Sequence, residues 1–97
     1  MFFSRKKPTH VSFRGTVSGR VQSVAFRFYT RQEATQLGLT GWVRNMPDGQ
    51  VEFLVQGPAP EVQEFLQWLE KGSPLAIVRD VSFEPVEPET LSEFEIR

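Results

Sequence analysis

Residues 39–56 read LTGWVRNMPDGQVEFLVQ and decide the fold, because they hold two strand-like segments joined by one tight turn. Pro47-Asp48-Gly49 is a turn sequence with a physical basis, since proline presets its φ angle and glycine accepts a positive φ. Residues 39–46 form the strand before the turn, and residues 50–56 form the alternating strand after it. The stretch therefore predicts a β-hairpin, whose second strand has one apolar face made of Val51, Phe53 and Val55.

A helical pattern lies on each side of this hairpin. From about residue 24 to 37, residues typical of a buried stripe recur at helical spacing: Phe26, Thr30, Ala34 and Leu37, with Ala25 and Tyr29 widening the stripe. Residues 57–60 end the second strand and open another helix, which ends at the Lys71-Gly72-Ser73-Pro74 sequence. The apolar stripe of that helix is Val62, Phe65, Leu66 and Leu69.

Strands are also predicted at both ends of the chain. Residues 9–18 alternate, residues 76–84 alternate less cleanly, and residues 94–96 allow a short fifth strand. The order predicts an α+β, ferredoxin-like βαββαβ sandwich, with a mostly antiparallel sheet and two helices packed on one face. We expect residues 1–8 to be a flexible N-terminal tail and residues 9–97 to be a single domain. The fold hosts many functions and decides none of them.

The composition of the 97 residues excludes several kinds of site. Eleven Lys and Arg oppose twelve Asp and Glu, and a net charge of −1 is poor for sequence-independent nucleic-acid binding. There is no cysteine and only one histidine, His10, which excludes thiolate and histidine-rich metal sites. No apolar run approaches 18 residues, so nothing is expected to span a membrane. The expectation is a monomer in the cytoplasm, without metal or cofactor and without a nucleic-acid or membrane partner.

The loop from Gly19 to Ser23 runs from a strand into a helix, where unpaired backbone N–H groups form an anion site. Arg27 lies in the first turn of that helix, Arg31 one turn further, and Arg20 in the loop. Cations there oppose the helix dipole, at about 0.3–1 kcal/mol each. A local rule broken without compensation often marks a functional site, and the compensation we infer is a bound anion gripped by the Arg27 guanidinium. The alternative is that the three arginines are simply solvated.

The other polar residues have structural interpretations. Asn45, near the hairpin turn, is of a type that usually caps backbone groups, and Arg44 is expected at the surface. His10 is expected to be solvated, and Trp42 and Trp68 to lie in the core or at its edge. Four acidic residues look like solvated faces: Glu52, Glu61, Glu64 and Glu70.

No carboxylate pair, Ser–His pair or metal-ligand cluster presents itself in the sequence. An enzyme built this way needs a reaction that requires little acid–base help. Hydrolysis of an acyl phosphate meets that condition, because its leaving group is a carboxylate, which is already stable as an anion. Positioning and electrostatic stabilisation of the phosphoryl group then suffice.

Two motifs in register resemble those of the acylphosphatases, small enzymes that hydrolyse carboxyl-phosphate mixed anhydrides. Residues 19–27 (GRVQSVAFR) are similar to the family's phosphate loop, and residues 38–45 (GLTGWVRN) with 48–52 (DGQVE) to its second motif. Residues 56–57, 72–74 and 94–97 fit later landmarks, so the resemblance runs from about Val11 to Arg97.

The resemblance implies a role for each motif residue. The loop amides and the Arg27 guanidinium would bind the substrate phosphate, and the Asn45 side-chain amide would hold the attacking water. The water would attack phosphorus in line, opposite the carboxylate, without a metal or a phosphoenzyme, and the products would be a carboxylate and inorganic phosphate. The loop positions that the resemblance assigns to the phosphate are Gly19, Arg20, Val21, Gln22, Ser23 and Val24.

Ser23 departs from the family pattern, which usually has a second loop glycine there. If that position needs a positive φ, serine costs roughly 1–2 kcal/mol. Three outcomes are open: the loop absorbs the strain, the hydroxyl donates to the phosphate, or the loop is distorted and catalysis is weakened. We expect activity to be retained, at a full or a reduced level.

Three alternative functions remain. One is a phosphate-binding module without catalysis, altered at Ser23. The second is an RNA-recognition domain, which shares the element order but stacks bases on sheet aromatics, whereas the outward positions of the third strand here are Glu52 and Leu54. The third is the related domain of hydrogenase-maturation carbamoyltransferases.

Overall fold

The computed structural model describes residues 9–97, so the predicted tail of residues 1–8 lies outside the described residues. Seven elements follow one another along this part of the chain. They are β1 (His10–Arg20), α1 (Phe26–Gln36), β2 (Thr40–Asn45), β3 (Val51–Pro58), α2 (Ala59–Lys71), β4 (Ile77–Pro85) and β5 (Phe94–Ile96).

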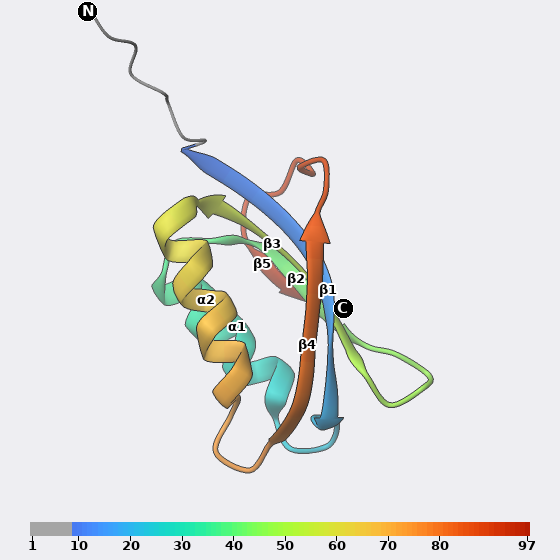
Figure 1. Cartoon of the computed structure of the whole chain (residues 1–97). Coiled ribbons are helices and arrows are strands. Elements are labelled where there is room, and N and C mark those ends of the chain that lie inside the picture. Colours follow the sequence, from blue (N-terminus) through green and yellow to red (C-terminus); the bar gives the residue numbers. More distant parts are fainter. Residues whose placement is uncertain (1–8) are drawn as a thin grey trace, which may run out of the picture.

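The strands form one sheet in the order β4-β1-β3-β2-β5, with α1 and α2 side by side on one face (Figure 1). The β1–β3, β1–β4 and β2–β3 pairs are antiparallel, and only the short β5 runs parallel to its neighbour β2. The predicted ferredoxin-like α+β fold is therefore confirmed, and the fifth strand is present. None of the helices formed by residues 9–97 is long and apolar enough to cross a membrane.

Most element boundaries differ from the predicted ones by one residue, and those of β1, β3 and α1 differ by two. β1 continues through Gly19 and Arg20, which pair with Val78 and Ile77 of β4 after a bulge, so these two residues are not part of the loop. β3 likewise runs through Gly57 and Pro58, because proline at a strand end leaves no ladder N–H missing from the interior. α1 begins at Phe26, and the preceding Ala25 is an exposed left-handed residue rather than a member of the buried stripe.

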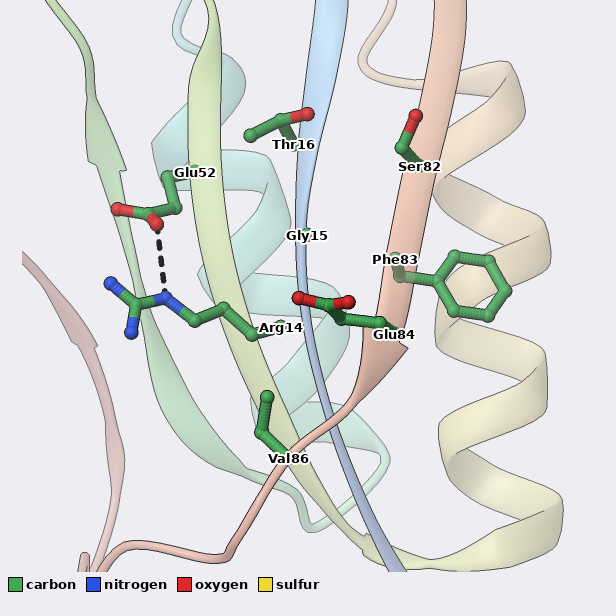
Figure 2. Close-up of a pocket in the computed structure, with 8 residues that line it drawn as sticks. All are labelled: Arg14, Gly15, Thr16, Glu52, Ser82, Phe83, Glu84 and Val86. Carbon is green, nitrogen blue, oxygen red and sulfur yellow. Dashed lines mark hydrogen bonds and ion pairs between the residues drawn. The ribbon is translucent and has the colours of Figure 1, made fainter.

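Charged and aromatic side chains cover the face of the sheet opposite the helices. Glu52 on β3 accepts a 3.0 Å hydrogen bond from Nε of Arg14 on β1 (Figure 2). It also accepts a 2.6 Å hydrogen bond from Nε of Arg44 on β2. The prediction of a solvated Glu52 is wrong, because its neighbours on both sides supply guanidinium groups and only 9% of the residue is exposed. Arg44 is, as expected, at the surface.

Trp42 lies on this same outer face and is 3% exposed. The guanidinium carbons of Arg14, Arg44 and Arg97 lie 5.2–5.5 Å from its ring, within the range of cation–π contacts. Its indole N–H donates to Oε1 of Glu89 over 3.4 Å. Trp42 was predicted to lie in the core or at its edge; it is buried, but on the outer face of the sheet and outside the main core cluster.

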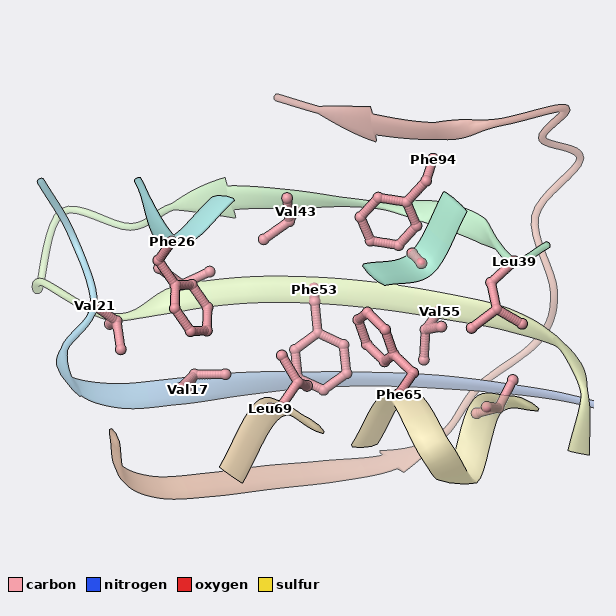
Figure 3. Packing of buried hydrophobic residues seen from close by; sticks show 13 residues of the cluster. Val17, Val21, Phe26, Leu39, Val43, Phe53, Val55, Phe65, Leu69 and Phe94 are labelled. Atoms are coloured by element: carbon pink, nitrogen blue, oxygen red, sulfur yellow. The ribbon is translucent and has the colours of Figure 1, made fainter. Parts of the chain in front are cut away.

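The inner face carries the hydrophobic core, where side chains of the sheet meet those of α1 and α2 (Figure 3). Phe53 and Phe65 meet edge to face at 6.0 Å between ring centroids, and Phe94 extends the row at 5.8 Å from Phe65. Trp68 packs against the edge of this cluster, as predicted. Three members of the predicted stripe of each helix are fully buried: Phe26, Thr30 and Ala34 on α1, and Val62, Phe65 and Leu69 on α2.

Candidate active site

The loop between β1 and α1 contains two residues in the left-handed region. Ser23 has φ 64° and Ala25 has φ 58°, and both are exposed. Non-glycine residues adopt this region at about 1–2 kcal/mol each. A glycine at position 23 would adopt this conformation without strain, which fits the family pattern of a glycine there. Nothing in the sequence predicted the strain at Ala25. Strained backbone persists only where its surroundings hold it, and it is concentrated at functional sites.

Helix α1 starts without the groups that normally complete a helix N-terminus. Ala25 is its N-cap residue and makes no side-chain cap, and the first turn holds no acidic residue. The first helical main-chain bond is donated by Tyr29 N–H to Ala25 O at 3.1 Å, so the N–H groups before it have no helical acceptor. Alternating right- and left-handed backbone turns successive N–H groups into a concave anion site. The positive end of the helix thus opens toward the loop.

Gln22 fixes this loop to the β2–β3 hairpin. Its side-chain amide nitrogen donates to two main-chain oxygens, those of Met46 and Gln50, each at 2.8 Å. Met46 and Gln50 also pair with each other across the turn, Met46 N–H donating to Gln50 O at 2.8 Å. The sequence predicted Gln22 to lie in the phosphate loop. It did not predict that Gln22 braces the loop, because the acceptors belong to a hairpin more than twenty residues away.

Arg27 and Asn45 face the same hollow from different elements. The hollow has a volume of about 200 Å³ and lies between the start of α1 and the ends of β2 and β5. Arg27 is half-buried, and its Nη1 donates to the main-chain oxygen of Arg97 at 3.1 Å. Asn45, the last residue of β2, is exposed. The lining residues are Val21, Ser23, Ala25, Phe26, Arg27, Phe28, Asn45 and Ile96.

The structure brings together only some of the residues singled out in the sequence. Val21, Ser23, Arg27 and Asn45 line the hollow. Gly19 and Arg20 belong to β1, and Gln22 points to the hairpin instead. Gly19 has φ 124° at the β1 bulge, where an added Cβ would lie 2.1 Å from the Ile77 carbonyl oxygen, so its glycine is needed for close strand packing. Val24 packs against the core cluster, and His10 is exposed as predicted.

Other hollows are less suited to an anion. The outer-face hollow of Figure 2 is larger, at about 470 Å³, but its one arginine, Arg14, is already paired with Glu52, and Glu84 adds a second carboxylate. A third hollow, between the helices, is lined by Glu33 and Glu64; burial raises the pKa of Glu33, and the charge of Glu64 raises it further. Within residues 9–97, no group of three or more His, Cys, Asp or Glu side chains is arranged to hold a metal ion.

Comparison with known proteins identifies one family. The model of the acylphosphatase family matches residues 13–96. An acylphosphatase of Trichormus variabilis is 52% identical over 81 residues, which cover 84% of this chain and 80% of that protein. Two solved structures are also similar: an acylphosphatase from Coxiella burnetii (TM-score 0.88, 38% identity, covering 92% of this chain and 94% of that one) and one from Bacillus subtilis (TM-score 0.87, 39% identity, covering 90% and 98%).

Proposed function

Because this chain belongs to the acylphosphatase family and is a hydrolase of acyl phosphates, we propose that its chemistry takes place in the hollow between the start of α1 and the end of β2. The observation that carries the proposal is the shared hollow itself. It unites Arg27, Asn45 and a helix start whose N–H groups have no helical acceptor. One end of the substrate, the phosphate, is recognised there.

The substrate phosphate binds to the backbone N–H groups of the loop that ends at Val24, and to the Arg27 guanidinium. A guanidinium presents two parallel N–H donors to two phosphate oxygens, and the helix dipole adds positive potential. Gly19 and Arg20 support the loop as the end of β1, and Gln22 holds it against the hairpin. Preorganised donors of this kind need no rearrangement as charge develops on the phosphoryl group.

Asn45 holds the attacking water through its side-chain amide. The water oxygen attacks phosphorus, and the bond between phosphorus and the acyl oxygen breaks, so that the carboxylate leaves with the electron pair. The water proton passes to the phosphate, which leaves as inorganic phosphate. A carboxylate needs no protonation to leave, and the site lining contains no carboxylate or histidine that would serve as a base. The mechanism requires no metal ion.

A monomeric state and a cytoplasmic location belong to the same proposal. Of the large apolar side chains exposed among residues 9–97, two line the hollow and the other three, Leu75, Ile77 and Phe83, lie in or just before β4. Scattered exposure of this kind is normal for a monomer. A charged acyl phosphate does not cross a bilayer unaided, so the enzyme must share a compartment with the reactions that form it. Light scattering and cell fractionation test these two points.

The test of the mechanism is hydrolysis of benzoyl phosphate in the presence of EDTA by the wild type and by Arg27→Ala. We expect turnover in EDTA, and a loss of about 10²–10³-fold or more in the variant, because Arg27 stabilises the transferring phosphoryl group. Arg31→Ala, one turn further along the same helix, is the matched control and should lose far less. A folded wild type that binds inorganic phosphate without hydrolysing the substrate would instead support a non-catalytic phosphate-binding module altered at Ser23.

A further inference from the structure

The hollow has an apolar part that the proposed phosphate chemistry does not use. Arg27, Asn45 and Ser23 supply polar groups, whereas Phe28 of α1 and Ile96 of β5 supply apolar surface. Phe28 is 48% exposed and Ile96 is 36% exposed. These two side chains come from elements that are far apart in the sequence, and both line this hollow together with Arg27.

Phe28 is held in place although about half of it stays open to solvent. Its ring meets that of Tyr29 edge to face at 5.4 Å between centroids. The guanidinium carbon of Arg31 lies 6.0 Å from the Phe28 ring centroid, at the limit of a cation–π contact. A ring fixed in this way loses little conformational freedom when a ligand covers its open surface, which favours binding.

The size of the hollow limits what else it accommodates. At about 200 Å³ it is smaller than the roughly 300–1,000 Å³ of pockets that enclose drug-sized ligands. A phosphate and the first atoms of an acyl group fill such a volume. The remainder of a larger acyl group must then lie on the rim, where Phe28 and Ile96 are exposed.

We propose that Phe28 and Ile96 form the acyl-binding surface of this enzyme and select substrates with an apolar acyl group, aromatic or branched aliphatic, over short or anionic ones. The inference rests on the proposed function, since it takes the phosphate end to be bound at Arg27. Covering the exposed apolar surface of both side chains removes it from water when the acyl group binds. Phe28 also offers an aromatic acyl group a ring to stack on.

The competing interpretation assigns the acyl group to the nearby cations. Arg20 and Arg31 are exposed, and either would attract an acyl group that carries a carboxylate. One observation favours the apolar surface: Phe28 and Ile96 line the hollow, whereas neither arginine does.

The test compares kcat/KM for benzoyl phosphate, acetyl phosphate and succinyl phosphate in the wild type, Phe28→Ala and Ile96→Ala. Comparing ratios between variants cancels the different intrinsic reactivities of the substrates. Phe83→Ala is the matched control, because Phe83 is 46% exposed and makes a similar edge-to-face contact at 5.3 Å, but lies on β4 outside the hollow. The inhibition constant of inorganic phosphate reports separately on the phosphate end.

In Phe28→Ala we expect the benzoyl-to-acetyl ratio of kcat/KM to fall about three- to tenfold, mostly through KM, which is the range that an aromatic pair contributes. Ile96→Ala should lower the ratio less, and Phe83→Ala should leave it unchanged. Equal losses on benzoyl and acetyl phosphate, or a selective loss on succinyl phosphate, would overturn the proposal. Failure of the proposed function has a different signature, because then the wild type would hydrolyse none of the three substrates.

Discussion

The two helices begin in opposite ways although each follows a strand of the same sheet. α2 starts with Pro60 in its first turn and Glu61 close behind, and it ends with Lys71 in the last turn. Gly72 then closes it, donating its N–H to Trp68 O at 2.8 Å. Each of these features satisfies free backbone groups or complements the helix dipole.

α1 has none of these features at its start. Neither helix has a side-chain cap, but the N-cap residue of α1 is strained and Arg27 stands where an acid is preferred. The core side of the two helices does not explain the difference, because each buries three stripe residues against the same sheet. Packing therefore determines where each helix lies, whereas the residues of its first turn distinguish α2, which supports the fold, from α1, which we propose binds the phosphate.

The largest expected effect is a loss of catalytic activity when the site at the start of α1 is altered. Asn45→Ala removes the amide that faces the start of α1 across the hollow, and kcat on benzoyl phosphate should fall about 10²–10³-fold. Unfolding in urea should change by less than about 0.5 kcal/mol, because Asn45 is exposed.

The matched change at the other helix is Glu61→Gln. It removes the acid from the first turn of α2 and should lower stability by about 0.3–1 kcal/mol while activity stays at the wild-type level. Equal losses of activity in Asn45→Ala and Glu61→Gln would contradict the proposal that only the start of α1 takes part in catalysis.

A smaller effect concerns strain in the loop. Ser23→Gly relieves about 1–2 kcal/mol of left-handed strain but costs about 0.5–1 kcal/mol, because glycine loses more conformational entropy on folding; we expect a net gain in stability of up to about 1.5 kcal/mol. Gln67→Gly, at an exposed position of α2, should instead lower the free energy of unfolding by about 1 kcal/mol. Thermal unfolding measures both, and steady-state turnover of Ser23→Gly shows whether the strain also limits catalysis. No gain in stability or in turnover would contradict a strained loop.

The smallest effect lies where the two helices meet. The pKa of Glu33 is raised by burial and by Glu64, so its neutral form is favoured in the folded state, and stability is lost as pH rises through the folded pKa. Glu33→Gln stays neutral and should raise stability at pH 7 by about 0.2–0.5 kcal/mol. The gain should disappear below the ordinary glutamate value of 4.5. Urea midpoints from pH 3 to 8 test this, and an equal gain at pH 3 would exclude an electrostatic cause.

Much of the fold could be predicted because it depends on local patterns. The alternation around Phe53 and the helical stripe through Phe65 each report burial of one face, and both residues are in the core. The hairpin turn at Pro47-Asp48-Gly49 could be predicted for the same reason, since its chemistry lies within a few residues. Glu52 was misjudged, because its two partners come from neighbouring strands and no local pattern reveals them.

In the candidate site, too, features that depend on local sequence could be predicted, whereas others could not. Arg27 stood out because a cation in a first turn is a local anomaly, and Ser23 stood out against the family pattern. The bracing by Gln22, the strain at Ala25 and the apolar part of the hollow could not be read from the sequence. The bracing by Gln22 and the apolar part of the hollow depend on segments that are distant along the chain and become neighbours only in the folded sheet.

The bond between the Arg27 guanidinium and the main-chain oxygen of Arg97 joins residues 70 positions apart. On the ribosome, at about 5–20 residues per second, Arg27 is therefore made roughly 4–14 s before the group that it contacts. β5 likewise pairs with β2 only after a delay, which is shorter, at roughly 3–11 s. The hairpin and both helices are therefore synthesised before the chain can complete the hollow that we propose as the active site.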